Sequence, residues 1–359
     1  MSTARDGIDF GYAFGTVRSP WFSWRLPVRI AAMSTALVLA AIVMATTSVM
    51  LGDYPLTLGQ VLEALSGSGE VFHRTIVLEW RLPVAVAAVV FGALLGIGGA
   101  IFQSLTRNPL GSPDVIGFDA GSYTAVVVTI LALGVTSYWS IAAAAIVGGL
   151  LTAAAVYVLA YRRGLQGFRL IIVGIGVSAV LGSINAYLIT RADIEDAMVV
   201  GFWGAGSISR VSWTGMAPSL VLSAVVLIAA TVLAPALRRL ELGDDAAITQ
   251  GLRPRGARLA LLATGVVTTA LVTAVAGPIG FVALVAPQLA RRLTRSPGVS
   301  LVSAAAMGSA LLTAAHLLSL VIATFFRPVP VGLITVCLGG IYLIWLLVHE
   351  ARAQYGRPS

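Results

Sequence analysis

The sequence has little charge, one cysteine and no lysine, and these shortages exclude several classes of protein. Only 11% of the 359 residues are charged, while 58% are hydrophobic and the mean hydropathy is +0.94. A soluble domain has about twice that charge, so the composition excludes a soluble enzyme. Cys337 stands alone, which excludes an intramolecular disulfide and a Cys-x-x-Cys metal or redox site. The basic residues, all arginine, do not indicate a nucleic-acid partner, and we expect none.

The chain also lacks the motifs of several chemistries. It contains no Gly-x-x-x-x-Gly-Lys-Ser/Thr loop, so any ATP that drives it is bound by another chain and we expect no cofactor here. Every Asp and Glu falls in a loop or near the end of an apolar run, which argues against a proton-coupled carrier because such a carrier needs a carboxylate at bilayer depth. His316 lies mid-run without a second ligand, so we expect a packed, hydrogen-bonded side chain, no catalytic residue and no metal site. Gln103, Thr273 and Asn185 are expected to bridge neighbouring helices.

Ten apolar runs are candidates for membrane spans. A helix needs about 20 residues to cross the hydrocarbon layer, and the eighth run is short and bounded by Gly and Pro. The sequence therefore predicts an all-α integral membrane protein with about ten transmembrane helices. The predicted spans are 28–51, 82–105, 115–133, 138–161, 168–190, 213–237, 256–276, 279–293, 299–323 and 330–349.

The distribution of arginine predicts the orientation of these spans. If the N-terminus is cytoplasmic, the cytoplasmic segments carry eighteen arginines and the outer segments five. Cytoplasmic loops hold the excess of basic residues in membrane proteins, so we expect both termini in the cytoplasm. The predicted organisation is a cytoplasmic lead (1–27), a transmembrane domain (28–350) and a cytoplasmic tail (351–359).

One predicted cytoplasmic loop, residues 238–258, differs from the others. Three consecutive apolar residues stand there between capping signals, which a solvated connector does not need. Asp244 or Asp245 can cap a short helix, and Gly251 can take the left-handed conformation that ends it. We therefore favour a helix that docks a soluble partner over a solvated loop, with its apolar residues presented to the cytoplasm. The segment contains Gly243, Asp244, Asp245, Ala246, Ala247, Ile248, Gly251 and Leu252.

Several motifs in order resemble the FecCD/BtuC family of permease subunits, which serve bacterial ABC importers of ferric siderophores, haem and vitamin B12. The resemblance extends from about residue 28 to 349. It is carried by Arg81-Leu82-Pro83, Gly92-Ala93-Leu94-Leu95 through Gln103, Asn108-Pro109-Leu110 with Pro113, the loop 243–252, Gly280-Phe281-Val282-Ala283-Leu284, Ala286-Pro287-Gln288-Leu289-Ala290-Arg291, Pro330-Val331-Gly332 and Gly339-Gly340.

The resemblance implies a fold, a location and partners. It implies the type II ABC importer permease fold in the bacterial cytoplasmic (inner) membrane. The partners it implies are a second permease subunit, two copies of an ATP-binding subunit that hold ATP and Mg, and an extracytoplasmic substrate-binding protein. The loop 243–252 falls where the family places its coupling helices.

The resemblance also implies roles for individual residues. Asn108 and Leu110, together with the segment Gln166-Gly167-Phe168, correspond to the cytoplasmic gate, although Gly167 and Phe168 depart from the small hydroxyl residues frequent there. Arg81 corresponds to an outer arginine that pairs with acidic residues of the binding protein. The family's fifth span lines the path, which makes Ser178, Ser183 and Asn185 candidates for lining residues, with packing as an equal alternative for each.

Departures from the common motifs narrow the subfamily. The family often has Pro-His-Ile-Ala-Arg where this chain has Pro287-Gln288-Leu289-Ala290-Arg291. This form, with the Gly339-Gly340 segment, resembles the second permease subunit of ferric enterobactin-type systems, which pair two different permeases. We therefore expect a heterodimer and a ferric siderophore as substrate, with haem or cobalamin as the alternatives within the family and a proton-coupled carrier as a distant one.

Overall fold

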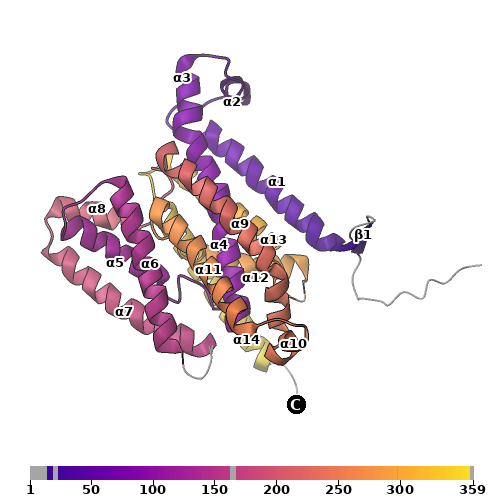
Figure 1. The fold of residues 1–359 in the computed structure, drawn as a ribbon. Helices are drawn as coiled ribbons and strands as arrows, with labels where there is room; N and C mark the ends of the chain where they lie inside the picture. The colour runs from indigo at the N-terminus through magenta and orange to yellow at the C-terminus, as the bar shows by residue number, and fades with distance from the viewer. Residues whose placement is uncertain (1–13, 19–22, 162–166, 297, 356–359) are drawn as a thin grey trace, which may run out of the picture.

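The computed structural model describes residues 14–18, 23–161, 167–296 and 298–355, and these are almost entirely helical (Figure 1). A two-stranded antiparallel hairpin, which the all-α prediction lacks, precedes the first helix. The elements are β1 (Phe14–Arg18), β2 (Ser23–Pro27), α1 (Val28–Met50), α2 (Leu58–Leu65), α3 (Val71–Arg74), the π-helix η1 (Thr75–Arg81), α4 (Leu82–Thr106), α5 (Phe118–Leu131), α6 (Tyr138–Ala160), α7 (Gly167–Arg191), α8 (Ile194–Gly204), α9 (Trp213–Glu241), α10 (Asp244–Thr249), α11 (Pro254–Ala276), α12 (Val282–Thr294), α13 (Leu301–Ala323) and α14 (Val331–Tyr355).

Each of the ten predicted spans contains a helix. Within the described ranges, seven helices are long and apolar enough to cross a membrane, so the chain is a multi-pass membrane protein. The helices within the third and eighth predicted spans are shorter than the hydrocarbon layer is thick. At 14 and 13 residues, α5 and α12 extend about 20 Å each, against a hydrocarbon layer of about 30 Å. The helix of the predicted span 115–133 begins three residues later than expected, because residues 115–117 belong to the non-helical segment 107–117 that joins α4 to α5.

The centre of the molecule is α4, which packs against α1, α9, α11, α12 and α13 (Figure 1). Its glycines lie where neighbouring backbones approach. A Cβ on Gly92 or Gly96 would overlap the backbone of α13, and a Cβ on Gly99 would overlap the carbonyl oxygen of Ala283 in α12. Helices in lipid associate through such close packing because lipid tails are as apolar as leucine. The glycine cluster thus fixes how near α12 and α13 lie to α4.

A second group of helices, α5 to α8, lies beside this centre (Figure 1). In it α5 packs against α6, α7 and α8, and both α5 and α6 contact α11. At one end of the molecule α2 and α3 project from the bundle, while α10 lies at the opposite end, near the C-terminus (Figure 1). The long helices therefore join two ends that carry different short helices.

Replacing Gly99 by alanine should lower the free energy of unfolding by about 1–3 kcal/mol, because the added methyl forces α4 away from Ala283. Gly201→Ala in α8 is the matched control, since a Cβ there meets nothing within 4 Å and alanine favours a helix by up to about 1 kcal/mol. Unfolding in mixed detergent micelles measures both. Equal stability of the two variants would contradict the packing described for α4.

Candidate functional site

The end that carries α10 contains the predicted docking loop. The helix exists, and Gly251 has a φ of +76° just beyond it, so both expectations are confirmed. The predicted cap is wrong, because the N-cap is Gly243 and no side chain caps the helix. The Asp244 carboxylate instead accepts a hydrogen bond from Arg258 of α11. This ion pair fastens the start of α10 to the bundle.

The expectation that all apolar residues of α10 face the cytoplasm is wrong for Ala247. Ala247 is fully buried in a cluster with Ile97 and Ile101 of α4, Leu237 and Leu240 of α9 and Leu261 of α11. Ile248 is 56% exposed, and Leu242, just before the helix, is 68% exposed. The difference arises because a helix of six residues has one face on the bundle and one away from it. Ile248 is therefore the most exposed apolar side chain of α10, and Ala246 is half-buried.

The predicted gate residues Asn108 and Leu110 lie in the loop after α4. The Oδ1 atom of Asn108 accepts a hydrogen bond from the Leu110 amide (2.9 Å), and the Gly111 amide donates to the Asn108 carbonyl (2.9 Å). Asparagine side chains form such turns readily because they mimic a backbone carbonyl. The turn holds Leu110 half-buried. Its role as a gate stays a prediction.

Three polar side chains link the segment 103–114 to α12, and sequence reasoning missed the pattern that they form. Gln103 donates to the Leu284 carbonyl (2.8 Å), and Gln288 donates to the Pro109 carbonyl (2.6 Å). Asp114 accepts from the amide of Phe281 (2.8 Å), at the start of α12. The sequence does contain a signal for these links, since all three are polar residues within apolar runs or at their ends. The segment that contains the predicted gate is therefore fixed along α12.

The other predicted gate residues open α7. A Cβ on Gly167 would overlap the backbone of Thr106 at the end of α4, so this glycine lets α7 approach the gate segment closely. The side chain of Phe168 is 73% exposed. The structure thus brings Gly167 to the Asn108 turn and leaves Phe168 outside it. Gln166, together with Arg162 and Arg163, lies outside the described residues.

One carboxylate is buried inside the bundle, which corrects the expectation that none would be. Asp119, in the first turn of α5, is 8% exposed and accepts a hydrogen bond from the Thr273 hydroxyl of α11 (3.0 Å). Sequence reasoning missed it because Asp119 lies close to the start of the predicted span 115–133, where a carboxylate is expected near the membrane surface. The helix N-terminus favours a negative charge at this position. The Thr273 bridge between helices, like the Gln103 bridge, is confirmed.

Two candidate path residues of α7, Ser178 and Asn185, are seven residues apart and share one face of the helix, while Ser183 lies on another. Ser178 contacts Gly117 just before α5 and donates to the Gly174 carbonyl (2.8 Å), so packing accounts for it. Asn185 is 4% exposed, and its Oδ1 has no partner among the described residues. Ser183 is exposed and bonds only to its own helix, at the Ala179 carbonyl. A role in lining a path stays a prediction for all three residues.

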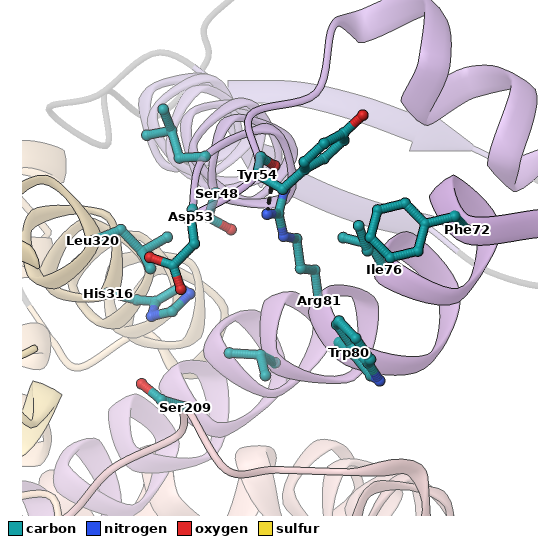
Figure 2. Close-up of a pocket in the computed structure, with 13 residues that line it drawn as sticks. Ser48, Asp53, Tyr54, Phe72, Ile76, Trp80, Arg81, Ser209, His316 and Leu320 are labelled. Carbon is teal, nitrogen blue, oxygen red and sulfur yellow. Dashed lines mark hydrogen bonds between the residues drawn. The ribbon is translucent and has the colours of Figure 1, made fainter. Parts of the chain in front are cut away.

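At the end of the molecule that carries α2 and α3, the Arg81 side chain binds backbone carbonyls of neighbouring segments (Figure 2). Its guanidinium donates to the Val49 carbonyl (2.9 Å) in the last turn of α1 and to the Tyr54 carbonyl (2.7 Å). A cation that bonds the last carbonyls of a helix stabilises its C-terminus. Arg81 therefore fastens α1 to η1, and its expected contact with a binding protein stays a prediction.

A pocket of about 290 Å³ opens beside Arg81 (Figure 2). Its lining includes Asp53, Trp80 and the imidazole of His316, which is 4% exposed. The packing expected for His316 is confirmed. The hydrogen bond expected for it is absent at Nδ1, which has no partner among the described residues. Asp53 and His316 come from distant parts of the sequence, so their proximity could not be predicted.

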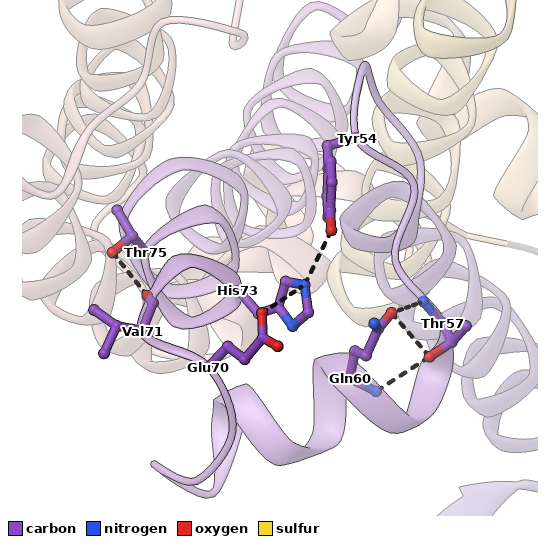
Figure 3. A network of polar contacts seen from close by, with 7 residues as sticks. All are labelled: Tyr54, Thr57, Gln60, Glu70, Val71, His73 and Thr75. Carbon is purple, nitrogen blue, oxygen red and sulfur yellow. Dashed lines mark hydrogen bonds and ion pairs between the residues drawn. The ribbon is translucent and has the colours of Figure 1, made fainter.

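A network of polar contacts orders the projecting helices α2 and α3 (Figure 3). A capping box begins α2. The backbone amide of Gln60 donates to the Thr57 hydroxyl, and the side-chain oxygen of Gln60 accepts from the backbone amide of Thr57. His73, 8% exposed, lies 3.3 Å from the Tyr54 hydroxyl and 3.8 Å from Glu70. These polar contacts lie beside a small apolar cluster that includes Leu56, Val61 and Ile76, and the two together order this surface segment.

Comparison with known proteins gives consistent similarities. Residues 37–349 match the sequence profile of the FecCD transport family. The chain is 44% identical over 320 residues to the ferric enterobactin transport system permease protein FepG of Escherichia coli (strain K12), covering 89% of this chain and 96% of FepG. It is 34% identical over 260 residues to FepD, another ferric enterobactin transport system permease protein of the same organism, covering 72% of this chain and 77% of FepD.

Among solved structures, a metal-chelate type ABC transporter in an inward-facing conformation has the same fold. Its TM-score is 0.74 at 23% sequence identity, covering 89% of this chain and 99% of that one. The expected permease fold is thereby confirmed. Because the family profile and the similarity to FepG both extend over most of its length, the chain belongs to the FecCD transport family.

Proposed function

We propose that the chain is a transmembrane permease subunit of an ATP-binding-cassette importer that moves a ferric siderophore into the cytoplasm. The observation that carries this proposal is the similarity to FepG, a ferric enterobactin permease, over nearly the whole of both chains. The sequence has no phosphate-binding loop, so ATP and Mg belong to separate ATPase subunits. The chain is a transporter subunit and not an enzyme.

The proposed location is the cytoplasmic membrane of a bacterium, with both termini in the cytoplasm. The excess of arginine in one set of loops supports this orientation. It places α10 and the end of α14 on the cytoplasmic side, and α2 and α3 outside (Figure 1). The pocket beside Arg81 then faces the side from which a substrate-binding protein delivers the siderophore.

The proposed membrane partner is a second, related permease, and α7 offers a surface for it. A Cβ on Gly176 or Gly182 meets nothing within 4 Å, and Ser183 is exposed beside them. The same helix also exposes large apolar side chains, including Ile172 and Val180, as α1 and α9 do with Ile42 and Ile228. Small residues favour close helix contacts in membranes. A heterodimer is favoured, because the FepG and FepD names describe two permeases of one ferric enterobactin system.

Transport would proceed by alternating access. A large ferric siderophore needs a wide route without strong binding sites, since tight binding inside would slow its release. A path of small and apolar side chains between two permeases supplies such a route, and affinity resides in the external binding protein. Two ATPase subunits would dock against α10 and its counterpart, and their closure would move the gate segment near Asn108 and Leu110.

Deleting this chain should abolish uptake of one ferric siderophore and leave haem and cobalamin uptake intact. The measurement is accumulation of radiolabel from a panel of ferric siderophores, haem and cobalamin in cells that lack only this chain. Restoring the chain on a plasmid controls for effects on neighbouring genes. Loss of haem or cobalamin uptake instead would retain the importer and overturn the assigned substrate.

Ile248→Arg should uncouple ATP hydrolysis from transport without unfolding the chain, because it changes the exposed face of α10 alone. Ala247→Arg should instead lower stability by at least about 3 kcal/mol, since it buries an unpaired charge in the cluster beneath α10. Uptake, ATPase activity and thermal unfolding of the purified complex separate the two effects. Val302→Arg, at a residue 67% exposed at the start of α13, is the control for an added surface charge. Normal uptake by the Ile248→Arg variant would contradict a docking role for α10.

A further inference from the structure

Gln288 of α12 joins three parts of the molecule through one buried side chain. It is 7% exposed, and its Nε2 donates to the carbonyl of Pro109, between the predicted gate residues Asn108 and Leu110, at 2.6 Å. On the other side its Oε1 accepts from the hydroxyl of Tyr342 in α14 at 3.4 Å. The amide therefore lies between the gate segment and α14.

The chemistry of the two partners fixes the orientation of the amide. A carbonyl oxygen can only accept a hydrogen bond, so the NH₂ group of Gln288 must face Pro109, which leaves the amide oxygen for the Tyr342 hydroxyl. A carboxylate at this position would place an acceptor against the Pro109 carbonyl. An apolar side chain could form neither the hydrogen bond to Pro109 nor the one to Tyr342. The site thus requires a side chain that has a donor on one side and an acceptor on the other.

The contact with α14 is reinforced one turn further along α12. The Arg292 guanidinium lies 4.9 Å from the centre of the Trp345 ring and 6.0 Å from that of Tyr342, within the range of cation–π attraction. Elsewhere α14 packs against α13, and much of its surface, including Leu338 and Ile341, is exposed. The contacts of Gln288 and Arg292 therefore hold α14 to the helix that also holds the gate segment.

We propose that Gln288 is a positioning residue of the cytoplasmic gate, which holds the Asn108–Leu110 turn against α12 and links its position to α14. The inference rests on the proposed function, because it takes the turn to be the gate of an importer. Gln103 and Asp114 bind the same segment to α12 at other points. Gln288 differs from them in binding within the turn itself and in reaching α14. A displacement of α14 would then be transmitted to Leu110 through two hydrogen bonds.

The test uses the thiol reactivity of residue 110 in the complete importer. The parent carries Cys337→Ser, which removes the single native thiol, and Leu110→Cys, and it is labelled in inside-out vesicles with a membrane-impermeant maleimide. Gln288→Leu should raise the labelling rate about fivefold, because a lost hydrogen bond of typical strength shifts a conformational equilibrium by about that factor. Gln288→His can keep one donor and one acceptor, and it should restore the parent rate.

Gln103→Leu is the matched control. It removes an equally buried amide hydrogen bond between α4 and α12 but leaves the turn bound to Gln288, so residue 110 should react at the parent rate. Unchanged labelling in Gln288→Leu, or an equal increase in Gln103→Leu, would overturn the positioning role. Uptake of radiolabelled ferric enterobactin, which we expect Gln288→Leu to impair, is measured in parallel. Raised labelling with normal uptake would show that the Asn108–Leu110 turn is not the gate, and the inference would fail with that assignment.

Discussion

The close approach of α4 to its neighbours is the contact on which the rest of the structure depends. In lipid, apolar surface alone does not drive helices together, so association relies on tight packing and on hydrogen bonds. Gly92, Gly96 and Gly99 let the backbones of α13 and α12 reach α4 directly. The same approach brings the Gln103 side chain within hydrogen-bonding distance of the Leu284 carbonyl. Larger side chains on this face of α4 would separate α12 from the segment that carries Asn108 and Leu110.

Two helices too short to cross the membrane create a second requirement. Backbone groups at bilayer depth must find partners within the protein, and the segment 107–117 and the start of α12 leave such groups without helical partners. Asp114 meets this need at the amide of Phe281, and Gln288 at the carbonyl of Pro109. Irregular backbone held by side chains can change position by exchanging a few hydrogen bonds, which a continuous helix cannot do. The segment 107–117 is therefore suited to a part that moves during transport.

Sequence reasoning predicted the long helices well, because runs of about twenty apolar residues have one stable form in a membrane. It also predicted α10 and its terminal glycine from capping chemistry. It placed Ala247 wrongly, because a short amphipathic pattern does not tell which face meets the bundle. The burial of Asp119 and the bonds of Arg81 to α1 were missed for another reason. Both depend on contacts between residues far apart in the sequence, such as Asp119 with Thr273, and a single sequence does not encode these contacts as a local pattern.

Reconstitution of purified components in proteoliposomes tests most directly whether this chain works as one subunit of an ATP-driven importer. The components are this chain, a second permease, the ATPase and the binding protein, with internal radiolabelled ferric siderophore as the measured quantity. The account predicts accumulation that requires ATP and every component, and none with this chain alone. Accumulation by this chain alone under a proton gradient would contradict it and would make the buried carboxylate of Asp119 the centre of a proton-coupled mechanism.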